Sequence, residues 1–179
     1  MRRLTALLLP TLCMPACADV DGEPAARCAA AESVVGDATA WRVVADAADP
    51  FGARSDRCPP TAHATEVQGD LRWHELDTST CSGGTLTQTT LVDLCEGQSV
   101  RVDMWLFPLR VAEGPFVVTL GFGDDAHDLG RFNVASSDEG QWLELVAGVP
   151  FDVPAGTPLW LSIANHGANT WNVFDVVVE

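Results

Sequence analysis

The sequence predicts an all-β chain folded as a two-layer β-sandwich of jelly-roll topology, with about nine strands. From Trp41 onward, short apolar or alternating runs recur with turn-forming residues between them. No window shows sustained apolar spacing of three and four residues, which a helix would require. The length of 179 residues gives room for one domain of ordinary size. About nine strands in such a domain suit a sandwich, and Greek-key or jelly-roll connections are the usual solution.

The N-terminal segment has the features of an export signal. Arg2 and Arg3 precede an apolar stretch from Leu4 to Leu12, and small residues follow it. The stretch is shorter than the roughly 20 residues that a membrane-spanning helix needs, and no later segment of the sequence is long enough either. We therefore expect residues 1–16 to be a signal peptide.

The run from Met14 to Cys17 resembles a bacterial lipobox, in which the cysteine becomes the lipidated first residue of the mature protein. This resemblance implies lipidation of Cys17, and ordinary cleavage nearby without lipidation is the alternative. Residues 17–30 would then hold the lipid anchor and a flexible tether, although Pro24–Glu32 has an alanine-rich, helix-like composition. Residues 31–179 would form the sandwich domain. The expected location is the bacterial cell envelope, at the outer membrane or cell surface.

Four cysteines, Cys28, Cys58, Cys81 and Cys95, remain beyond the anchor position. An even number in an exported chain predicts two disulfides, and four cysteines allow three pairings. A strand predicted between Cys81 and Cys95 would be about 30 Å long, whereas bridged Cα atoms lie within about 7 Å, so these two should not pair. A meander favours Cys58 with Cys81 and Cys28 with Cys95, and the third pairing stays open. The sequence has no C-x-x-C run, which disfavours a zinc site.

The charge balance excludes some classes of partner. Acidic residues outnumber basic ones by 25 to 10, giving a formal net charge of −15, and every basic residue is arginine. Such a field repels phosphate backbones and anionic membrane surfaces, so we expect no nucleic-acid partner and membrane contact only through the lipid anchor. A hydrophobic fraction of 47% with 20% charged residues argues for a folded domain. The sequence does not indicate an oligomeric state.

The strands of the first half of the domain are apolar or alternating runs between turn signals. The turn-forming cluster Glu96-Gly97-Gln98 closes this half. The strands predicted here are Trp41–Ala45, Ala64–Gln68, Leu71–Leu76 and Leu86–Leu94.

The clearest strand follows, at Val100–Phe107. Its even-numbered residues are all apolar and share one face. Its odd-numbered residues share the other face, and they are Arg101, Asp103, Trp105 and Phe107. Phe116–Phe122 alternates in the same way, with its even-numbered side chains expected to point inward.

The last three predicted strands are Trp142–Val146, Leu159–Ala164 and Trp171–Val178. The run Pro154–Pro158, with alanine, glycine and threonine between its prolines, is a turn signal between the first two. In Leu159–Ala164 the leucines and Ile163 form the core-facing set. Trp160 and Ser162 should therefore face outward.

Two parts of the sequence carry a family resemblance. Thr85–Leu94, followed by Cys95–Trp105, resembles a jelly-roll segment of carbohydrate-binding modules with the galactose-binding-like fold. Their inward glutamine, turn glycine and strand-ending aromatic would correspond to Gln88, Gly97 and Trp105. Phe151–Ile163 and Phe174–Val178 are similar to that family's penultimate strand and its final strand. The resemblance covers about Leu86 to Glu179 and implies a non-catalytic, carbohydrate-binding jelly roll.

The same family often holds a structural calcium ion between a glutamate of an opening Asn-x-x-Phe-Glu run and an aspartate of the final strand. Asp175 matches the aspartate. Glu32 lies nine residues before Trp41 and lacks the neighbouring phenylalanine, so the opening departs from the pattern. We expect no cofactor, and structural calcium is the one metal that the resemblance leaves open.

The outward side chains suggest a sugar-binding platform. Trp105 lies beside Arg101 and Asp103, which combines a flat apolar ring with groups that bond hydroxyls. Trp142 and Glu144 form a similar pair. The ligand-binding residues predicted in this way are Trp105, Trp160, Arg101, Asp103 and Gln88. The alternative for each tryptophan is burial under a loop.

Two polar segments have simpler explanations. Gly123–Asp128 holds three carboxylates and His127, which would suit calcium, but it lacks the spacing of a calcium loop and favours a solvated hairpin turn. The loop from His166 to Trp171 could line a site, although asparagine and glycine are also ordinary turn residues.

The sequence contains no G-x-S-x-G elbow, no P-loop and no dinucleotide-binding fingerprint, so we expect no enzyme. We therefore predict a non-catalytic binding module of the cell envelope that recognises carbohydrate. The alternative is a structural or protein-interaction surface lipoprotein whose partner is another envelope protein. A small hydrolase would require either a histidine such as His74 or His166 bonded to a nucleophile or an acid of raised pKa in a pocket.

Overall fold

Ten strands and three short 3₁₀ helices make up the structure, a computed structural model that describes residues 28, 32–52, 56–108, 116–135, 137–164 and 167–179. The signal, the lipobox with Cys17 and most of the tether therefore lie outside the described residues. The elements in chain order are η1 (Ala38–Ala40), β1 (Arg42–Val43), η2 (Asp46–Ala48), η3 (Pro60–Ala62), β2 (His63–Gln68), β3 (Leu71–Asp77), β4 (Gly83–Thr89), β5 (Ser99–Leu106), β6 (Phe116–Phe122), β7 (His127–Val134), β8 (Gln141–Gly148), β9 (Pro158–Ala164) and β10 (Thr170–Val178).

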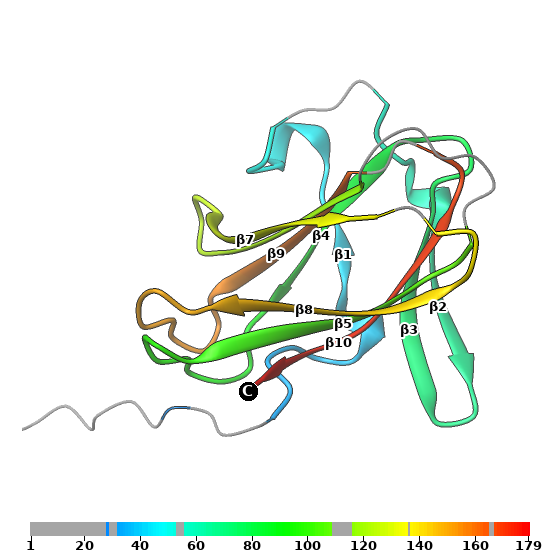
Figure 1. The fold of residues 1–179 in the computed structure, drawn as a ribbon. Coiled ribbons are helices and arrows are strands. Elements are labelled where there is room, and N and C mark those ends of the chain that lie inside the picture. Colours follow the sequence, from blue (N-terminus) through cyan, green and yellow to red (C-terminus); the bar gives the residue numbers. More distant parts are fainter. Residues whose placement is uncertain (1–27, 29–31, 53–55, 109–115, 136, 165–166) are drawn as a thin grey trace, which may run out of the picture.

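The strands form two antiparallel five-stranded sheets that pack face to face (Figure 1). One sheet has the order β1-β4-β9-β6-β7 and the other β2-β3-β10-β5-β8. We call them the β9 sheet and the β10 sheet after their central strands. Except in the two hairpins β2–β3 and β6–β7, consecutive strands lie in opposite sheets, as they do in a jelly roll. The predicted fold class is thus confirmed.

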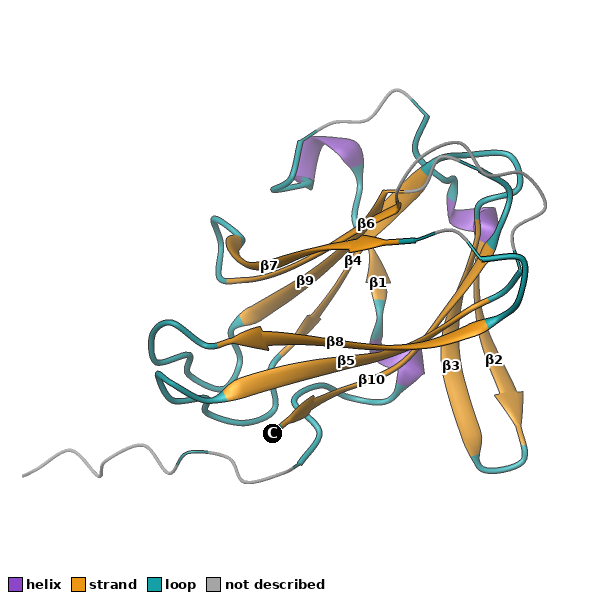
Figure 2. Ribbon diagram, viewed as in Figure 1, coloured by secondary structure: helices purple, strands orange, loops and turns teal. Residues whose placement is uncertain are grey.

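The core lies between the sheets, as the alternation in the sequence predicts. Phe116, Val118, Leu120 and Phe122 of β6 are fully buried, and so are the even-numbered residues of β5. Trp171 of β10 packs edge-on against Phe116, with ring centroids 5.7 Å apart. Figure 2 shows that the 3₁₀ helices lie outside the two sheets, in connecting segments. Among the described residues, no helix has the length and apolar character to cross a membrane.

The strand bounds differ most from the predictions at three places. β1 is only two residues long, and β4 spans Gly83–Thr89 rather than Leu86–Leu94. β7 was not predicted, because it is an edge strand with only one buried residue and its sequence therefore shows no apolar alternation. The predicted helical stretch Pro24–Glu32 lies outside the described residues except for its Cys28 and Glu32, neither of which is helical.

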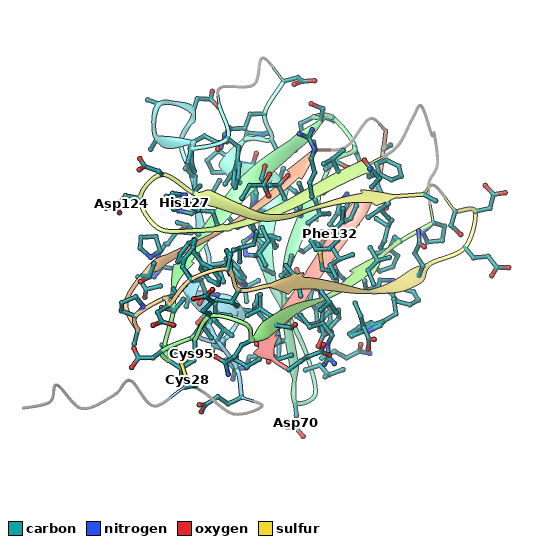
Figure 3. The ribbon with its side chains drawn as sticks, turned by 60° about the vertical axis from the view of Figure 1, so that its left-hand side comes forward. Cys28, Asp70, Cys95, Asp124, His127 and Phe132 are labelled. Carbon is teal, nitrogen blue, oxygen red and sulfur yellow. A yellow bond between two sulfur atoms is a disulfide. The ribbon has the colours of Figure 1, made fainter. Side chains whose placement is uncertain are left out.

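Two disulfides cross-link the sandwich, and they have the pairing that the sequence favoured. Cys58 is bonded to Cys81, which ties the segment between β1 and β2 to the start of β4. Cys28 is bonded to Cys95 at the turn before β5 (Figure 3). This second bridge fixes the point at which the N-terminal segment joins the domain.

Candidate functional site

Five aromatic rings follow one another across the outer face of the β10 sheet, and we call them the aromatic row. They are Trp73 of β3, Phe174 of β10, Trp142 of β8, Trp105 of β5 and Phe107, which directly follows β5. Phe174 lies between Trp73 and Trp142, with ring centroids 5.6 and 5.0 Å away. Trp142 pairs across the strands with Trp105, whose ring meets Phe107 at 6.4 Å. The rings thus form a continuous surface over four strands.

The rings face solvent because their neighbours along each strand fill the core. Leu76 and Met104 are fully buried, which turns Trp73 and Trp105 outward. Trp142 is 49% exposed and Phe107 is 44% exposed, whereas the other three rings are half-buried. Exposed rings held by a sheet offer a large flat contact area with little side-chain freedom to lose on binding.

A β-bulge places Phe174 in the row. The pairing of β10 with β5 shifts register between Val173 and Asp175, so an extra residue is inserted into β10. As a result, Phe174 and Asp175 are both partly exposed although they are consecutive. Strict alternation cannot show this, so the sequence gives no signal for Phe174. Trp73 could have been found, since it alternates with Leu76 and the buried His74.

The predicted polar groups Arg101 and Asp103 lie on the same face as Trp105 but are engaged with each other. Arg101 donates from Nε to Asp103 Oδ1 at 2.8 Å and from a terminal nitrogen to Asp103 Oδ2 at 3.2 Å. Its other terminal nitrogen donates to Glu179 at 2.9 Å. These bonds fix the guanidinium beside the row and neutralise it.

A column of carboxylates runs along β2 and β3 beside the row, and we call it the acidic column. It consists of Glu66, which pairs across the strands with Trp73, and of Glu75 and Asp77. Burial raises the pKa of Glu75 above its usual value, and the neighbouring charges of Glu66 and Asp77 add to this rise, while a hydrogen bond with Trp73 lowers it. Asp77 accepts a hydrogen bond from the Ser79 amide at 2.8 Å.

The acidic column leads to a hollow of about 400 Å³ at one end of the row, which we call the end hollow. Its described lining is Asp77, Ser79, Phe107, Pro108, Ala168, Asn169 and Thr170. Asn169 is 5% exposed, and its Oδ1 accepts from the Thr170 amide at 2.6 Å. Its Nδ2 is buried and has no hydrogen-bond partner among the described residues. An unpaired buried donor of this kind is costly, and it belongs to a residue that lines the end hollow.

Two predicted site residues lie elsewhere, which corrects the expectation of one platform. Trp160 belongs to β9 and faces outward from the other sheet, where its Nε1 donates to the Gly123 carbonyl at 2.7 Å. Gln88 lies beside it in a hollow of about 500 Å³ and is 6% exposed. Alternation shows that a side chain points outward, but it does not show which sheet the strand will join.

The segments considered for metal binding form no ion site in the described part of the chain. Gly123–Ala126 is the turn between β6 and β7, and His127 and Asp128 begin β7. Asp124 is exposed at the tip of the turn (Figure 3), so the predicted solvated hairpin turn is confirmed. Asp175 accepts from the Ser33 hydroxyl at 2.6 Å and from the Val176 amide, while Glu32 is exposed. His166 lies outside the described residues.

The described histidines do not form a nucleophile–base pair. His74 Nε2 lies 3.1 Å from His63 Nδ1, and its Nδ1 has no hydrogen-bond partner. The pKa of each ring is lowered to about 4, chiefly by burial. The charge of Arg57 also lowers the pKa of His63, and the charge of His63 also lowers the pKa of His74. Both rings are therefore neutral near pH 7 and are held between β2 and β3.

No family model matches this chain, and no curated protein matches it either. Solved structures resemble its backbone. The K3 adhesin domain of Lys-gingipain from Porphyromonas gingivalis has a TM-score of 0.49 at 10% identity over 83% of this chain and 99% of that one. The mannan-recognising carbohydrate-binding module TmCBM27 also has a TM-score of 0.49, at 7% identity over 84% and 95%. The module CBM6cm-2 of Cellvibrio mixtus lichenase 5A, in complex with cellotriose, has 0.42 at 15% over 69% and 91%. At these scores the likenesses carry no argument about what this chain binds.

Proposed function

We propose that this chain is a non-catalytic carbohydrate-binding module whose site is the aromatic row together with the end hollow. The observation that carries the proposal is the continuity of five solvent-facing rings over four strands of one sheet. A glycan chain offers the matching surface, because its apolar C–H faces pack on flat rings while its hydroxyls remain free for hydrogen bonds.

The polar groups beside the row suit sugar hydroxyls. The unpartnered Nδ2 of Asn169 is a donor, and the carboxylate of Asp77 is an acceptor, at the same hollow. A sugar hydroxyl can both donate and accept, so one sugar unit in the end hollow could satisfy both groups. The rings of the row would then hold the units that follow.

We further propose that the module is displayed on the cell envelope through lipidation of Cys17. The support is the lipobox resemblance and the polar tether in the sequence. The Cys28–Cys95 disulfide would join this tether to the domain at a fixed point. Metabolic labelling of the exported chain with a fatty acid, compared with its Cys17→Ser variant, tests the anchor, and equal labelling would reject it.

The second candidate function is attachment to an envelope protein. It is favoured by two exposed apolar side chains that do not belong to the row, Leu71 at 61% and Leu91 at 59% exposure. Both line a shallow hollow of about 520 Å³, which Phe174 of the row also lines. Large exposed apolar groups that share one hollow are a feature of protein-interaction surfaces.

A glycan array separates the two functions. Residues 18–179, which contain every described residue, would be applied with and without calcium, together with a Trp73→Ala, Trp142→Ala double variant. Trp160→Ala is the matched control, because it removes the same ring from the opposite sheet. We expect wild type and control to bind the same glycans and the double variant to lose them while keeping its circular dichroism spectrum. Absence of glycan binding by the wild type in both conditions would reject the proposal and favour a protein partner.

A further inference from the structure

The outward positions of the β10 sheet are strongly acidic. Within its five strands, all of them fully described, the outward carboxylates are Glu66, Glu75, Asp77, Asp103, Glu144 and Asp175. Arg101 is the cation at these positions, and it is already bonded to Asp103 and Glu179. The face through which the row would meet a ligand therefore carries excess negative charge.

The acidic column lies beside the rings and has no protein cation to neutralise it. Glu66 pairs across the strands with Trp73, and Glu75 pairs with Asn172 of β10, two residues from Phe174. No ion pair involving Glu66, Glu75 or Asp77 occurs in the described part of the chain. Burial is the largest cause of the raised pKa of Glu75. The neighbouring negative charges of Glu66 and Asp77 raise it further, because like charges disfavour the ionised form of Glu75.

An independent observation points to a ligand at the end of this column. Asp77 pairs with Thr170, and the end hollow is lined by Asp77 and by the neighbouring Asn169, whose buried Nδ2 has no hydrogen-bond partner among the described residues. The rings, the carboxylates and the unsatisfied donor thus follow each other along β3 and β10. A chain-like ligand bound in the end hollow would extend along the acidic column toward Trp73 and Phe174.

We infer that the ligand of this face is a glycan that carries protonated amino groups, such as a polymer of glucosamine. The inference rests on the proposed function and names its substrate class. An ammonium group held between an indole face and a carboxylate gains a cation–π attraction and a charge-assisted hydrogen bond. It also neutralises the repulsion within the acidic column. A neutral glycan gains neither benefit, and an anionic one such as a polyuronate is repelled.

Titration with matched oligosaccharides tests the inference. Residues 18–179 would be titrated by calorimetry at pH 6 with β-1,4-linked hexamers of glucosamine, N-acetylglucosamine and glucose. The first two differ in the charge of the amino group on the same backbone. We expect the glucosamine hexamer to bind at least tenfold more tightly than either neutral hexamer, and this advantage to shrink in 0.5 M salt.

A pair of charge-matched variants assigns the effect to the column. Glu66→Gln with Glu75→Gln should remove most of the preference for the glucosamine hexamer over the neutral hexamers. Asp124→Asn with Asp128→Asn removes the same formal charge from exposed positions on the β6–β7 hairpin, and it should keep the preference. Equal loss in both pairs would mean that net charge alone acts, and would overturn the inference.

The outcomes separate this inference from the proposed function. If the neutral hexamers bind as tightly as the glucosamine hexamer, or more tightly, the inference is wrong while carbohydrate binding stands. If no hexamer binds and the glycan array is also blank, both are wrong.

Discussion

The two outer faces of the sandwich differ in what lies over them. On the β10 sheet, outward side chains such as Trp142 reach solvent. On the β9 sheet, the outward Thr85 and Ser162 are 0% and 1% exposed, because the segment between β1 and β2 lies over them. An outward position in a strand is therefore available for a ligand only where no connecting segment covers it.

The covering segment is held by a buried polar network. Arg57 forms ion pairs with Asp46 and Asp49, and the Asp49 side chain has no solvent exposure. Thr85 donates to Asp49 at 2.8 Å and also lies 3.2 Å from the Ser162 hydroxyl. This network serves the fold of the β9 face, whereas the acidic column of the β10 face forms no ion pair in the described part of the chain. The comparison thus separates charges that stabilise the domain from charges that can meet a ligand.

Asp49→Ala should cause the largest loss in the free energy of unfolding, because Asp49 belongs to the network on the covered β9 face. The substitution leaves the nearly buried Arg57 without its buried partner, which typically costs about 3–5 kcal/mol. Urea unfolding should show this loss, while the remaining folded protein keeps its glycan affinity. Asp46→Ala is the control, because Asp46 is half-exposed and should cost less than about 1 kcal/mol. Similar losses for the two variants would contradict a buried network.

Acid should destabilise the domain through the histidine pair that lies between β2 and β3. The unfolded chain takes up protons near pH 6.5, whereas folded His63 and His74 resist protonation down to about pH 4. The free energy of unfolding should therefore fall as the pH drops from about 6.5 to about 4, with a slope of roughly one to two protons. No further loss from this pair is expected below that range.

Thermal unfolding across this pH range measures the effect. His63→Gln with His74→Gln should flatten the slope, whereas His127→Gln, at an exposed position, should keep the wild-type slope. A wild-type slope in the double variant would show that other groups cause the acid sensitivity.

Gly140→Ala should disturb the aromatic row without replacing any of its five rings. A Cβ atom at Gly140 would overlap the indole of Trp105, so the ring must move out of the row. We expect a shift in tryptophan fluorescence and a severalfold loss of glycan affinity. Gly148→Ala, at the far end of β8, the strand that Gly140 precedes, meets no atom within 4 Å and is the control. Unchanged affinity in Gly140→Ala would remove Trp105 from the site.

Asn169→Ala should have the smallest effect on stability. It removes one hydrogen bond, from the Thr170 amide to Oδ1, which contributes about 1 kcal/mol, and it also removes the unpartnered Nδ2. Glycan affinity should fall severalfold because the end hollow loses its donor. Calorimetry and urea unfolding on the same sample measure both. A loss of stability with full affinity would make Asn169 a structural residue only.

Much of the architecture could be read from the alternation of side chains. The even-numbered residues of β5 and β6 are buried as predicted, because a half-buried strand needs one apolar face wherever it lies. The disulfide pairing was favoured because bridged cysteines must lie close, and the length of a strand limits which can do so. β7 was not predicted because an edge strand with little burial does not need one apolar face.

The candidate site could be predicted only in part. The outward orientation of Trp105, Arg101 and Asp103 followed from their own strand, whereas Trp160 was assigned to the same platform although it belongs to the other sheet. Phe174 joins the row through a bulge, which depends on how β10 pairs with its neighbour. The unpartnered amide of Asn169 depends on the end hollow, which Asp77 and Phe107 line from other parts of the chain.

The sequence by itself determined the fold class, the inward and outward faces of the main strands, and the excess negative charge. These are local or additive properties, set by the side-chain period of a strand and by composition. The tertiary structure alone decided which strands share a sheet, which outward face is covered, and which rings meet in the aromatic row. Those properties arise from pairing between segments distant in the chain, and no local pattern of residues specifies them.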